Sequence, residues 1–243
     1  MRIVTLNTWK NEGDYPRRLR LMGDGLAALD PDVVCLQECF TGAGRDTAAT
    51  LAAGLGLRLH AAPARAKLRA HEGRLVESAS GLAILSRPPA QARVLSLPQD
   101  PADGERIAQQ LDLTACGRPL RVLNLHLTHL PGAEAAALRA VQLQTALDWA
   151  STGLVGALVV AGDLNATARS PELAPLRAPA AASTLQSPRA DGPVHEGLAI
   201  DHCCLVQAVA WRAVARRVAL EQPDPDGFRP SDHMAVVLDL EPA

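Results

Sequence analysis

Residues Leu158–Ala166, which read LVVAGDLNA, place a carboxylate and an amide directly after an apolar run of strand length. In extended backbone, residues two apart point to the same side, so Asp163 and Asn165 are predicted to lie together where a buried strand ends. That placement suits chemistry better than packing. An Asx turn, which Asp and Asn favour, would explain the same residues, and Gly162 fits that turn as well. This stretch alone leaves both interpretations open.

The same arrangement recurs along the chain, because polar side chains stand near the end or the start of several other predicted strands. These side chains are Asn7, Glu38, His126, Asp201, Asp232 and His233. In a mixed or antiparallel sheet, the starts of some strands meet the ends of others at one edge. We therefore predict that these residues line one rim together with Asp163.

A rim that gathers several carboxylates needs a compensating charge. An uncompensated buried charge costs on the order of several kcal/mol, and a hard divalent cation is the simplest remedy. Oxygen ligands favour Mg²⁺, Mn²⁺ or Ca²⁺ over Zn²⁺. Mg²⁺ needs only one or two carboxylates and keeps several waters, which matches one isolated Glu with separate Asp and Asn groups. The expected cofactor is therefore Mg²⁺, or Mn²⁺ in its place.

The two histidines predicted at the rim, His126 and His233, add acid–base capacity and hydrogen-bond donors for an anionic oxygen. Asp232 need not pair with its neighbour, because adjacent residues on a strand point to opposite faces. A more distant carboxylate such as Asp201 is a better orienting partner for His233. This set of residues predicts metal-assisted hydrolysis at a phosphoryl group. The histidines that we expect to be structural or to lie at the surface are His60, His71, His129, His195 and His202.

Length and composition favour one domain over residues 1–243, since 48% hydrophobic residues can build a sizeable core. A formal net charge of −2 argues against a long footprint on duplex nucleic acid, and 2% aromatics argue against a single-strand stacking platform. The five cysteines, an odd count with several in apolar runs, are typical of reduced thiols in a cytoplasmic protein. The N-terminus lacks the apolar core of a signal peptide, and no stretch approaches the ~20 apolar residues of a membrane span.

Hydrophobic periodicity predicts helices over residues 16–29, 47–55 and 133–149. Strands are predicted at 2–6, 33–36, 57–61, 81–85, 94–97, 107–114, 120–127, 154–162, 200–206, within 208–219 and at 234–240. Segment 65–74 is the most basic of the chain, and we interpret it as a solvated hairpin turning near Gly73, with contact to an anionic substrate as the alternative. The Pro-, Ala- and Ser-rich segment 166–197 is predicted to be a long loop with about one helical turn, of the kind that often carries specificity.

Seven short segments, each weak alone, occur together in a fixed order between residues 5 and 233. They are TLNTW from Thr5, LQE from Leu36, GLAILSR from Gly81, NLHL from Asn124, GDLNA from Gly162, ID from Ile200 and SDH from Ser231. In this order they resemble the endonuclease/exonuclease/phosphatase superfamily, which includes deoxyribonucleases, apurinic-site endonucleases, inositol polyphosphate 5-phosphatases and sphingomyelinases. The resemblance implies a four-layer α/β/β/α sandwich of class α+β, with two mixed, mostly antiparallel sheets and the site at one rim of both.

The resemblance also implies which residues hold the metal ion. Glu38 would be the principal ligand, with Asn7 and Asp232 close to the ion. Two departures from the family pattern bear on the rest of the site. His202 stands where relatives often have an aromatic residue, and the phosphate-contacting Arg of the family has no certain match, with Arg106 as the candidate.

The same resemblance implies roles in catalysis. Asp163 would orient or deprotonate the attacking water, Asn165 would align the phosphate, and His126 would donate to a phosphoryl oxygen. His233, paired with Asp201, would act in proton transfer or in stabilising the transition state. Family members differ over which group is the formal base, so that division stays open here.

These features predict a divalent-metal-dependent phosphoesterase that hydrolyses a P–O bond of a phosphodiester or phosphomonoester with an activated water. The alternative is a DNA or RNA endo- or exonuclease of the same fold. A non-catalytic binding module is disfavoured because the catalytic set is complete, and a zinc hydrolase is disfavoured by ligand type. The substrate, a small molecule or a nucleic acid, stays open, as do the number of metal ions and the oligomeric state. Stable membrane insertion is not expected, since the sequence contains no evident exposed aromatic hairpin.

Overall fold

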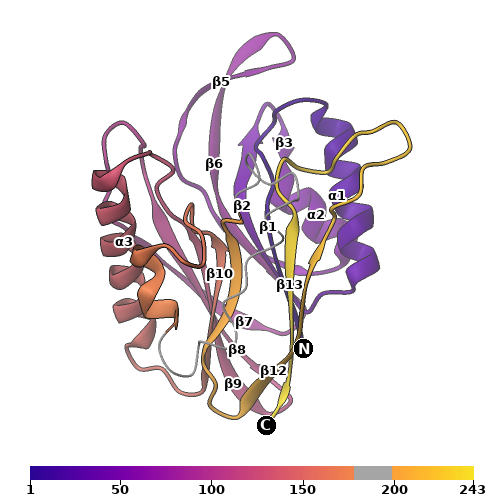
Figure 1. Ribbon diagram of the computed structural model, residues 1–243. Coiled ribbons are helices and arrows are strands. Elements are labelled where there is room, and N and C mark those ends of the chain that lie inside the picture. Colours follow the sequence, from indigo (N-terminus) through magenta and orange to yellow (C-terminus); the bar gives the residue numbers. More distant parts are fainter. Residues whose placement is uncertain (178–198) are drawn as a thin grey trace.

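Two β-sheets packed face to face form the centre of the computed structural model, which describes residues 1–177 and 199–243. Figure 1 shows helices α1 (Tyr15–Leu29) and α2 (Thr47–Leu55) outside one sheet and α3 (Ala133–Ser151) outside the other. The layers therefore follow the order α/β/β/α, and the predicted α+β sandwich is confirmed. Both termini lie at the same end of the sandwich (Figure 1).

The larger sheet holds eight strands and the smaller sheet five. The larger sheet runs in the order β12 (Trp211–Ala219), β13 (Ala235–Pro242), β1 (Arg2–Asn7), β2 (Val33–Gly42), β6 (Arg74–Ser86) and β4 (Arg58–Ala62), with β3 (Arg45–Asp46) beside β2 and β5 (Lys67–His71) beside β6. The smaller sheet runs in the order β11 (Asp201–Gln207), β10 (Ala157–Asp163), β9 (Arg118–His126), β8 (Ile107–Ala115) and β7 (Ala90–Ser96). Two pairs are parallel, β1 with β2 and β9 with β10, and the other strand pairs of the described residues are antiparallel.

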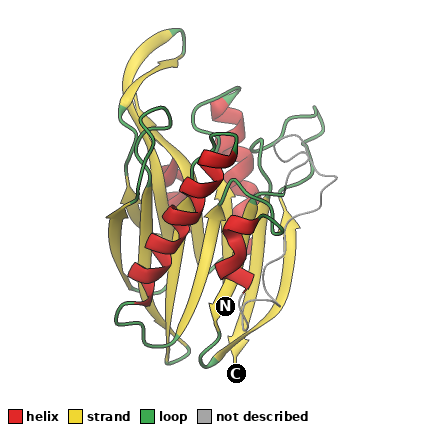
Figure 2. Ribbon diagram, turned by 60° about the vertical axis from the view of Figure 1, so that its left-hand side comes forward, coloured by secondary structure: helices red, strands yellow, loops and turns green. Residues whose placement is uncertain are grey.

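Apolar side chains fill the spaces between the layers. Leu111 and Trp211 are among the residues buried between the two sheets. Met22 and Leu26 of α1 pack against the outer face of the larger sheet. On the other side, α3 and the 3₁₀ helix η1 (Pro171–Arg177) cover the smaller sheet, as Figure 2 shows with α3 turned forward. Burial on both faces of each sheet explains why so many strands read as continuous apolar runs.

Local sequence signals set the boundaries of the helices. The Asp14 carboxylate caps α1 by accepting a hydrogen bond from the backbone N–H of Arg17. The same helix ends at Asp30, whose φ of 46° is left-handed, directly before Pro31. The predicted start and stop of this helix are therefore correct to within a residue.

Among the strands that are longer than predicted, β2 and β6 differ most. β2 continues to Gly42 instead of ending at residue 36, because a β-bulge shifts its register against β6 between Leu36 and Cys39. The polar residues in that bulge interrupt the ladder without ending the strand. β6 begins at Arg74, since its first half pairs with β5 in the predicted hairpin around Gly73.

Some predictions are tested only in part. Segment 166–197 is described as far as Arg177, where η1 supplies the predicted helical turn, and His195 lies outside the described residues. All five cysteines are free, and only Cys116 among them is exposed. In the part of the chain that the structure describes, no helix has the length and apolar character needed to span a membrane.

Candidate active site

Polar residues of both sheets meet at one rim of the sandwich. The parallel register of β9 and β10 pairs Asp163 with His126, and the antiparallel register of β10 and β11 pairs Asp163 with Asp201. The larger sheet contributes Asn7 at the end of β1 and His233 just before the start of β13. The ends of parallel strands thus meet the starts of antiparallel ones, which is the arrangement predicted from the polar strand ends.

The last part of β10 needs glycine at residue 162. Gly162 has a φ of 139°, and a Cβ added there would lie 1.9 Å from the carbonyl oxygen of Leu125. The strand ends at Asp163, and Asn165 adopts a left-handed φ of 48°. The backbone N–H of Asn165 donates to Asp163 Oδ1 at 3.0 Å, while its side-chain Nδ2 donates to the carbonyl of Leu127 at 3.0 Å. Residues 163–165 therefore form the Asx turn that was the alternative interpretation of this stretch, not extended backbone, and both Asp163 and Asn165 line the same cleft.

The Asp163 carboxylate is the point where these elements converge. Its Oδ2 accepts a hydrogen bond from Asn7 Nδ2 at 3.0 Å, and it lies 3.5 Å from His126 Nε2 and 3.9 Å from His233 Nε2. Asp163 is 1% exposed. Burial and the nearby Asp201 carboxylate raise the pKa of Asp163 above its usual range. A buried carboxylate with a raised pKa is suited to accept a proton at this position.

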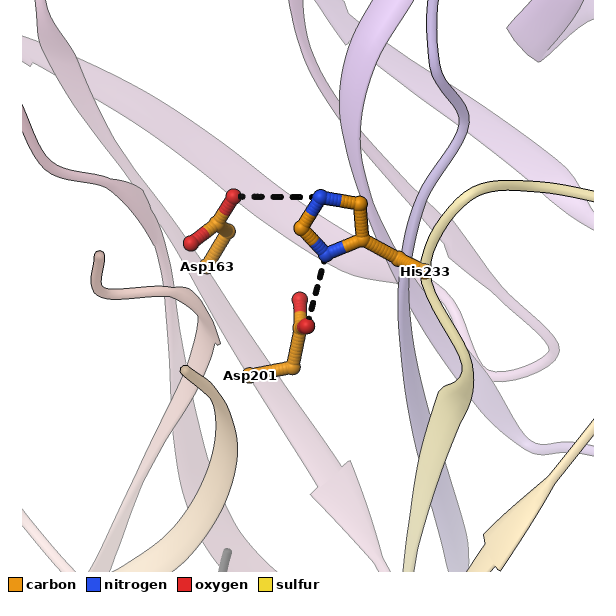
Figure 3. Close-up of side chains that lie close together, drawn as sticks. All are labelled: Asp163, Asp201 and His233. Atoms are coloured by element: carbon orange, nitrogen blue, oxygen red, sulfur yellow. Dashed lines mark hydrogen bonds and ion pairs between the residues drawn. The ribbon is translucent and has the colours of Figure 1, made fainter. Parts of the chain in front are cut away.

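His233 and Asp201 form an oriented pair beside Asp163 (Figure 3). His233 Nδ1 lies 2.7 Å from Asp201 Oδ2, which leaves Nε2 directed toward Asp163. Burial opposes a charge on this ring, but the Asp201 and Asp163 carboxylates outweigh it and raise the pKa of His233 to about 10. The pairing predicted from strand geometry is present, and Asp201 rather than the adjacent Asp232 holds the ring.

His126 differs from His233 in its electrostatics. The ring is buried, and burial together with the positive charges of Arg106 and Arg65 lowers the pKa of His126 well below its usual value. A neutral imidazole keeps one N–H donor and one acceptor. His126 therefore offers the site a neutral hydrogen-bonding group, whereas His233 offers a cationic one.

Glu38 lies in the β-bulge of β2 and has a left-handed φ of 56°. That conformation is rare for residues other than glycine and is concentrated at functional sites. Lys10 Nζ lies 3.2 Å from Glu38 Oε1. Trp9 and Lys10 also have left-handed φ values, 54° and 44°, in the loop that follows β1. The bulge and this strained loop together aim a carboxylate and an ammonium into the same space.

The types of donor atom that Glu38, Asn7 and Asp232 offer suit a hard divalent cation. Glu38, Asn7 and Asp232 all line one cleft and supply two carboxylates and an amide oxygen. Asn7 Oδ1 accepts a hydrogen bond from the Trp9 N–H at 3.0 Å, and because a carbonyl oxygen has two lone pairs it can also face a cation. The ammonium of Lys10 shows that Glu38 is placed to face a positive charge.

A second group of side chains also has ligand-like spacing. One ligand atom each of Asp163, Asp201 and His233 lie within 4.8 Å of one another. Within this group, however, the imidazole Nδ1 is already hydrogen-bonded to Asp201. The two candidate metal positions therefore differ in donor type, since one offers oxygen donors and the other includes an imidazole nitrogen.

Arg18 is a structural residue of the site that the sequence pattern did not single out. It is 2% exposed and lies on α1, with its guanidinium centre 4.7 Å from the centroid of the Trp9 ring. Its nitrogens donate to the backbone carbonyls of Thr8, Trp9, Lys10, Glu12 and Pro230. These bonds fix the loop after β1 and tie it to the segment before β13. In the sequence, the one feature that could have drawn attention to Arg18 is an arginine on the face of a predicted helix that is expected to be buried.

Arg106, predicted to contact the substrate phosphate, is 2% exposed and forms an ion pair with Asp103. Its Nη2 lies 2.5 Å from Asp103 Oδ1, and its Nε lies 2.8 Å from Asp103 Oδ2. Its Nη1 donates to the backbone carbonyl of His126 at 3.4 Å. Arg106 thus lies directly behind the site and contacts the main chain of a site residue, and a direct role on the phosphate stays a prediction.

The histidines expected to be structural or at the surface lie in different environments. His202 is buried, and its Nε2 lies 2.8 Å from the carbonyl oxygen of Ala166. His60 Nε2 lies 3.1 Å from Ser86 Oγ. His129, in contrast, lines the cleft, and its Nδ1 lies 2.7 Å from the buried Asp103 carboxylate. A cleft position for His129 was missed because the sequence does not show which loops meet.

A cleft of about 730 Å³ opens over the rim. Its lining residues are Asn7, Trp9, Lys10, Glu38, Arg65, Lys67, His126, His129, Leu130, Pro131, Arg139, Asp163, Asn165, Ile200 and Asp232. The cleft therefore extends from the Asp163 carboxylate to Glu38 in the β-bulge of β2. Several cationic side chains line it as well.

The chain matches the family described as Endonuclease/Exonuclease/phosphatase family over residues 4–233. The protein belongs to this family. The matched residues include the whole rim, from Asn7 to His233. It agrees with the resemblance that the ordered motifs indicated. No curated protein matches the chain significantly.

Solved structures of the same fold cover essentially the whole chain. An endonuclease/exonuclease/phosphatase from Beutenbergia cavernae DSM 12333 has a TM-score of 0.75 and 24% identity, covering 100% of this chain and 72% of that one. The human Nocturnin catalytic domain with bound sulfate anion has a TM-score of 0.72 and 20% identity, covering 100% and 94%. D. rerio TDP2 complexed with single strand DNA product has a TM-score of 0.70 and 17% identity, covering 99% and 98%. At these identities the structures show a shared fold.

Proposed function

We propose that this protein is a divalent-metal-dependent phosphoesterase that hydrolyses a P–O bond with an activated water. The observation that carries the proposal is the environment of Asp163, a buried carboxylate contacted by Asn7, His126 and His233 from three other segments. Structural packing alone would not gather these groups at the floor of a cleft, because burying so many polar side chains is costly. Membership in the family supports the same class of reaction.

In this proposal Asp163 orients the attacking water and accepts its proton. Asn165, which lines the cleft, aligns the phosphate. His126 donates a hydrogen bond to a phosphoryl oxygen, for which a neutral imidazole is competent. His233, held by Asp201, stabilises the charge that develops in the transition state or transfers a proton to the leaving group.

Glu38, Asn7 and Asp232 would hold the cation, for which we propose Mg²⁺ or Mn²⁺. The oxygen-only donor set supports this choice. A cation bound there would supply positive charge to the phosphate oxygens. Lys10, which pairs with Glu38 in this structure, would have to yield that carboxylate in part to the ion.

A nuclease of the same fold is the second candidate. Among the similar structures, D. rerio TDP2 is complexed with a single strand DNA product, whereas human Nocturnin holds a sulfate, which is a tetrahedral anion like phosphate. The formal net charge of −2 favours a small phosphoester over a long nucleic acid.

We also propose one domain over residues 1–243 and a cytoplasmic location, the latter supported by five free cysteines.

An activity screen tests the proposal. Abasic DNA, single-stranded DNA, bis(p-nitrophenyl) phosphate, inositol phosphates and sphingomyelin would each be incubated with Mg²⁺, with Mn²⁺ and with EDTA. We expect hydrolysis of at least one substrate with a divalent cation and none in EDTA. Activity of a nuclease should fall steeply with added salt, whereas activity on a small ester should change little. Full activity in EDTA would contradict the proposal.

A further inference from the structure

One wall of the cleft carries positive charge that the proposed chemistry does not use. Lys10, Arg65 and Lys67 line this wall, and Arg69 lies behind them with 8% exposure. Arg65 precedes β5, while Lys67 and Arg69 lie on it two residues apart and therefore on one face. The chain as a whole has a formal net charge of −2, so this excess is a local feature.

The buried guanidinium of Arg69 forms no ion pair with a carboxylate of the described residues, and Glu38 and Glu12 act on it only as charges at longer range. Its Nη1 donates to Ser78 Oγ at 2.9 Å, and its Nη2 donates to Ser80 Oγ at 2.6 Å and to the carbonyl of Arg65 at 2.9 Å. Its Nε is buried without a hydrogen-bond partner. Because a buried cation is costly unless it is paired, this position calls for an anion nearby.

The exposed side chain of Lys67 also indicates that an anion binds at this wall. No carboxylate of the described residues forms an ion pair with it, although it lines the cleft. Burial and the positive charges of Arg69, Arg65 and Lys10 lower the pKa of Lys67. An ion-paired lysine shows the opposite shift, so the ammonium lies in a field that an anionic ligand would relieve.

The positive charge of Arg65 is only weakly compensated by a carboxylate. Its Nη2 lies 3.8 Å from Asp103 Oδ1, an oxygen that Arg106 Nη2 contacts at 2.5 Å and His129 Nδ1 at 2.7 Å. The carboxylate is therefore shared among several cations, and the Arg65 guanidinium keeps donors for a ligand. Arginine and lysine side by side are the groups with which proteins bind phosphate.

We propose that Arg65 and Lys67, supported by Arg69, bind a second phosphate group of the substrate. This inference rests on the proposed phosphoesterase function and deepens it. The substrate is then a phosphoester with a further phosphate beside the one hydrolysed at Asp163. Oligonucleotides and inositol polyphosphates share this chemistry, whereas an ester with a single phosphate lacks it.

Paired substrates test the inference. The dinucleotide dTpdT would be compared with pdTpdT, which adds a 5′-phosphate, and inositol 1-phosphate with inositol 1,4,5-trisphosphate. For the wild-type protein, the added phosphate should raise kcat/KM at least about tenfold in one of the two pairs, the scale of a hydrogen bond between charged groups. The pair that responds distinguishes a nucleotide from an inositol substrate.

Lys67→Gln removes one charge of the wall at an exposed position. It should abolish most of the preference for the added phosphate and leave the rate on the single-phosphate member within about threefold, since only a charged hydrogen bond to the second phosphate is lost. Lys67→Arg should keep the preference. Arg74→Gln, which removes the same charge at the exposed far end of the hairpin, is the matched control and should behave as wild type.

Two results would overturn the inference: no preference in either pair, or an equal loss for both members of a pair in Lys67→Gln. If no substrate is hydrolysed at all, the proposed phosphoesterase function fails instead. Calorimetric titration with pdTpdT and with inositol 1,4,5-trisphosphate then decides the phosphate subsite by itself. At least about tenfold weaker binding of either to Lys67→Gln supports the subsite, and unchanged binding of both contradicts it.

Discussion

The imidazole Nδ1 of His233 lies 2.7 Å from Asp201 Oδ2, so a carboxylate of the smaller sheet fixes an imidazole that precedes the last strand of the larger sheet. The pair therefore bridges the two sheets at their rim. Its geometry depends on how the sandwich packs, because neither sheet alone contains both partners. The same pair directs the other ring nitrogen toward Asp163, which makes it a positioning device for the proposed site.

The pair makes stability depend on pH in the metal-free protein. Because the pKa of His233 is raised from 6.5 to about 10, protonated His233 stabilises the fold fully below pH about 6.5, and this contribution is lost as the pH rises toward 10. Asp201→Asn should therefore lower the free energy of unfolding most at pH 6 and progressively less toward pH 10. Urea denaturation of both proteins across this range measures the difference. A difference that grows with pH would show that the ring is not held as a cation.

Glu38→Gln should weaken Mn²⁺ binding at least about tenfold, because a neutral amide replaces the principal oxygen ligand. Calorimetric titration of the metal-free protein measures this directly. Glu134→Gln, at an exposed glutamate at the start of α3, is the charge-matched control and should bind as wild type. If Asp201→Asn abolished binding while Glu38→Gln did not, the ion would belong to the Asp163, Asp201 and His233 group instead.

Gly162→Ala should destabilise the fold by roughly 3 kcal/mol or more, because the φ of 139° is strained for alanine and the new Cβ would collide with the Leu125 carbonyl oxygen. Chemical denaturation measures the loss. Gly54→Ala is the control, since Gly54 lies in α2 with nothing within 4 Å of the added Cβ. That variant should be more stable than wild type by about 0.5–1 kcal/mol. Equal effects at the two positions would contradict the need for glycine at residue 162 of β10.

Arg18→Met should lower the free energy of unfolding by roughly 3 kcal/mol, because it leaves several buried backbone carbonyls without donors. The loop after β1 should also become more sensitive to limited proteolysis near Lys10. Arg20→Met, at an exposed position on the same helix, should change stability by less than about 0.5 kcal/mol. A loop as resistant in Arg18→Met as in wild type would mean that Arg18 does not hold it.

The fold and the floor of the site could be predicted because their signals are local. Apolar runs marked the buried strands, and polar residues at their ends marked the rim, so Asp163, His126 and Asp201 could be grouped before their distances were known. Asp30–Pro31 likewise marked the end of α1 through its backbone preference alone. Such signals depend only on neighbouring residues, so they can be recognised without knowledge of the tertiary structure.

The walls and supports of the site could not be predicted in the same way. Arg18 acts through carbonyls from two separate segments, and nothing near it in sequence shows which carbonyls it meets. His129 and Asp103 contact each other because two loops converge, which depends on the packed sheets. Asn165 lines the same cleft as Asp163, but the reason for expecting this was wrong. A two-residue spacing predicts a common face only in extended backbone, and β10 ends at Asp163, where an Asx turn begins.

In the proposed reaction, Asp163 is the group that activates water. Asp163→Asn keeps the size of the side chain and its hydrogen bond to the Asn165 N–H but removes the proton acceptor. With Mg²⁺ and the best substrate from the screen, kcat should fall at least ~10²-fold, the usual scale for a positioned acid or base. The control Asp24→Asn, at an exposed position on α1, should retain wild-type kcat. A kcat for Asp163→Asn within about threefold of wild type would contradict the account, because loss of a true proton acceptor costs far more.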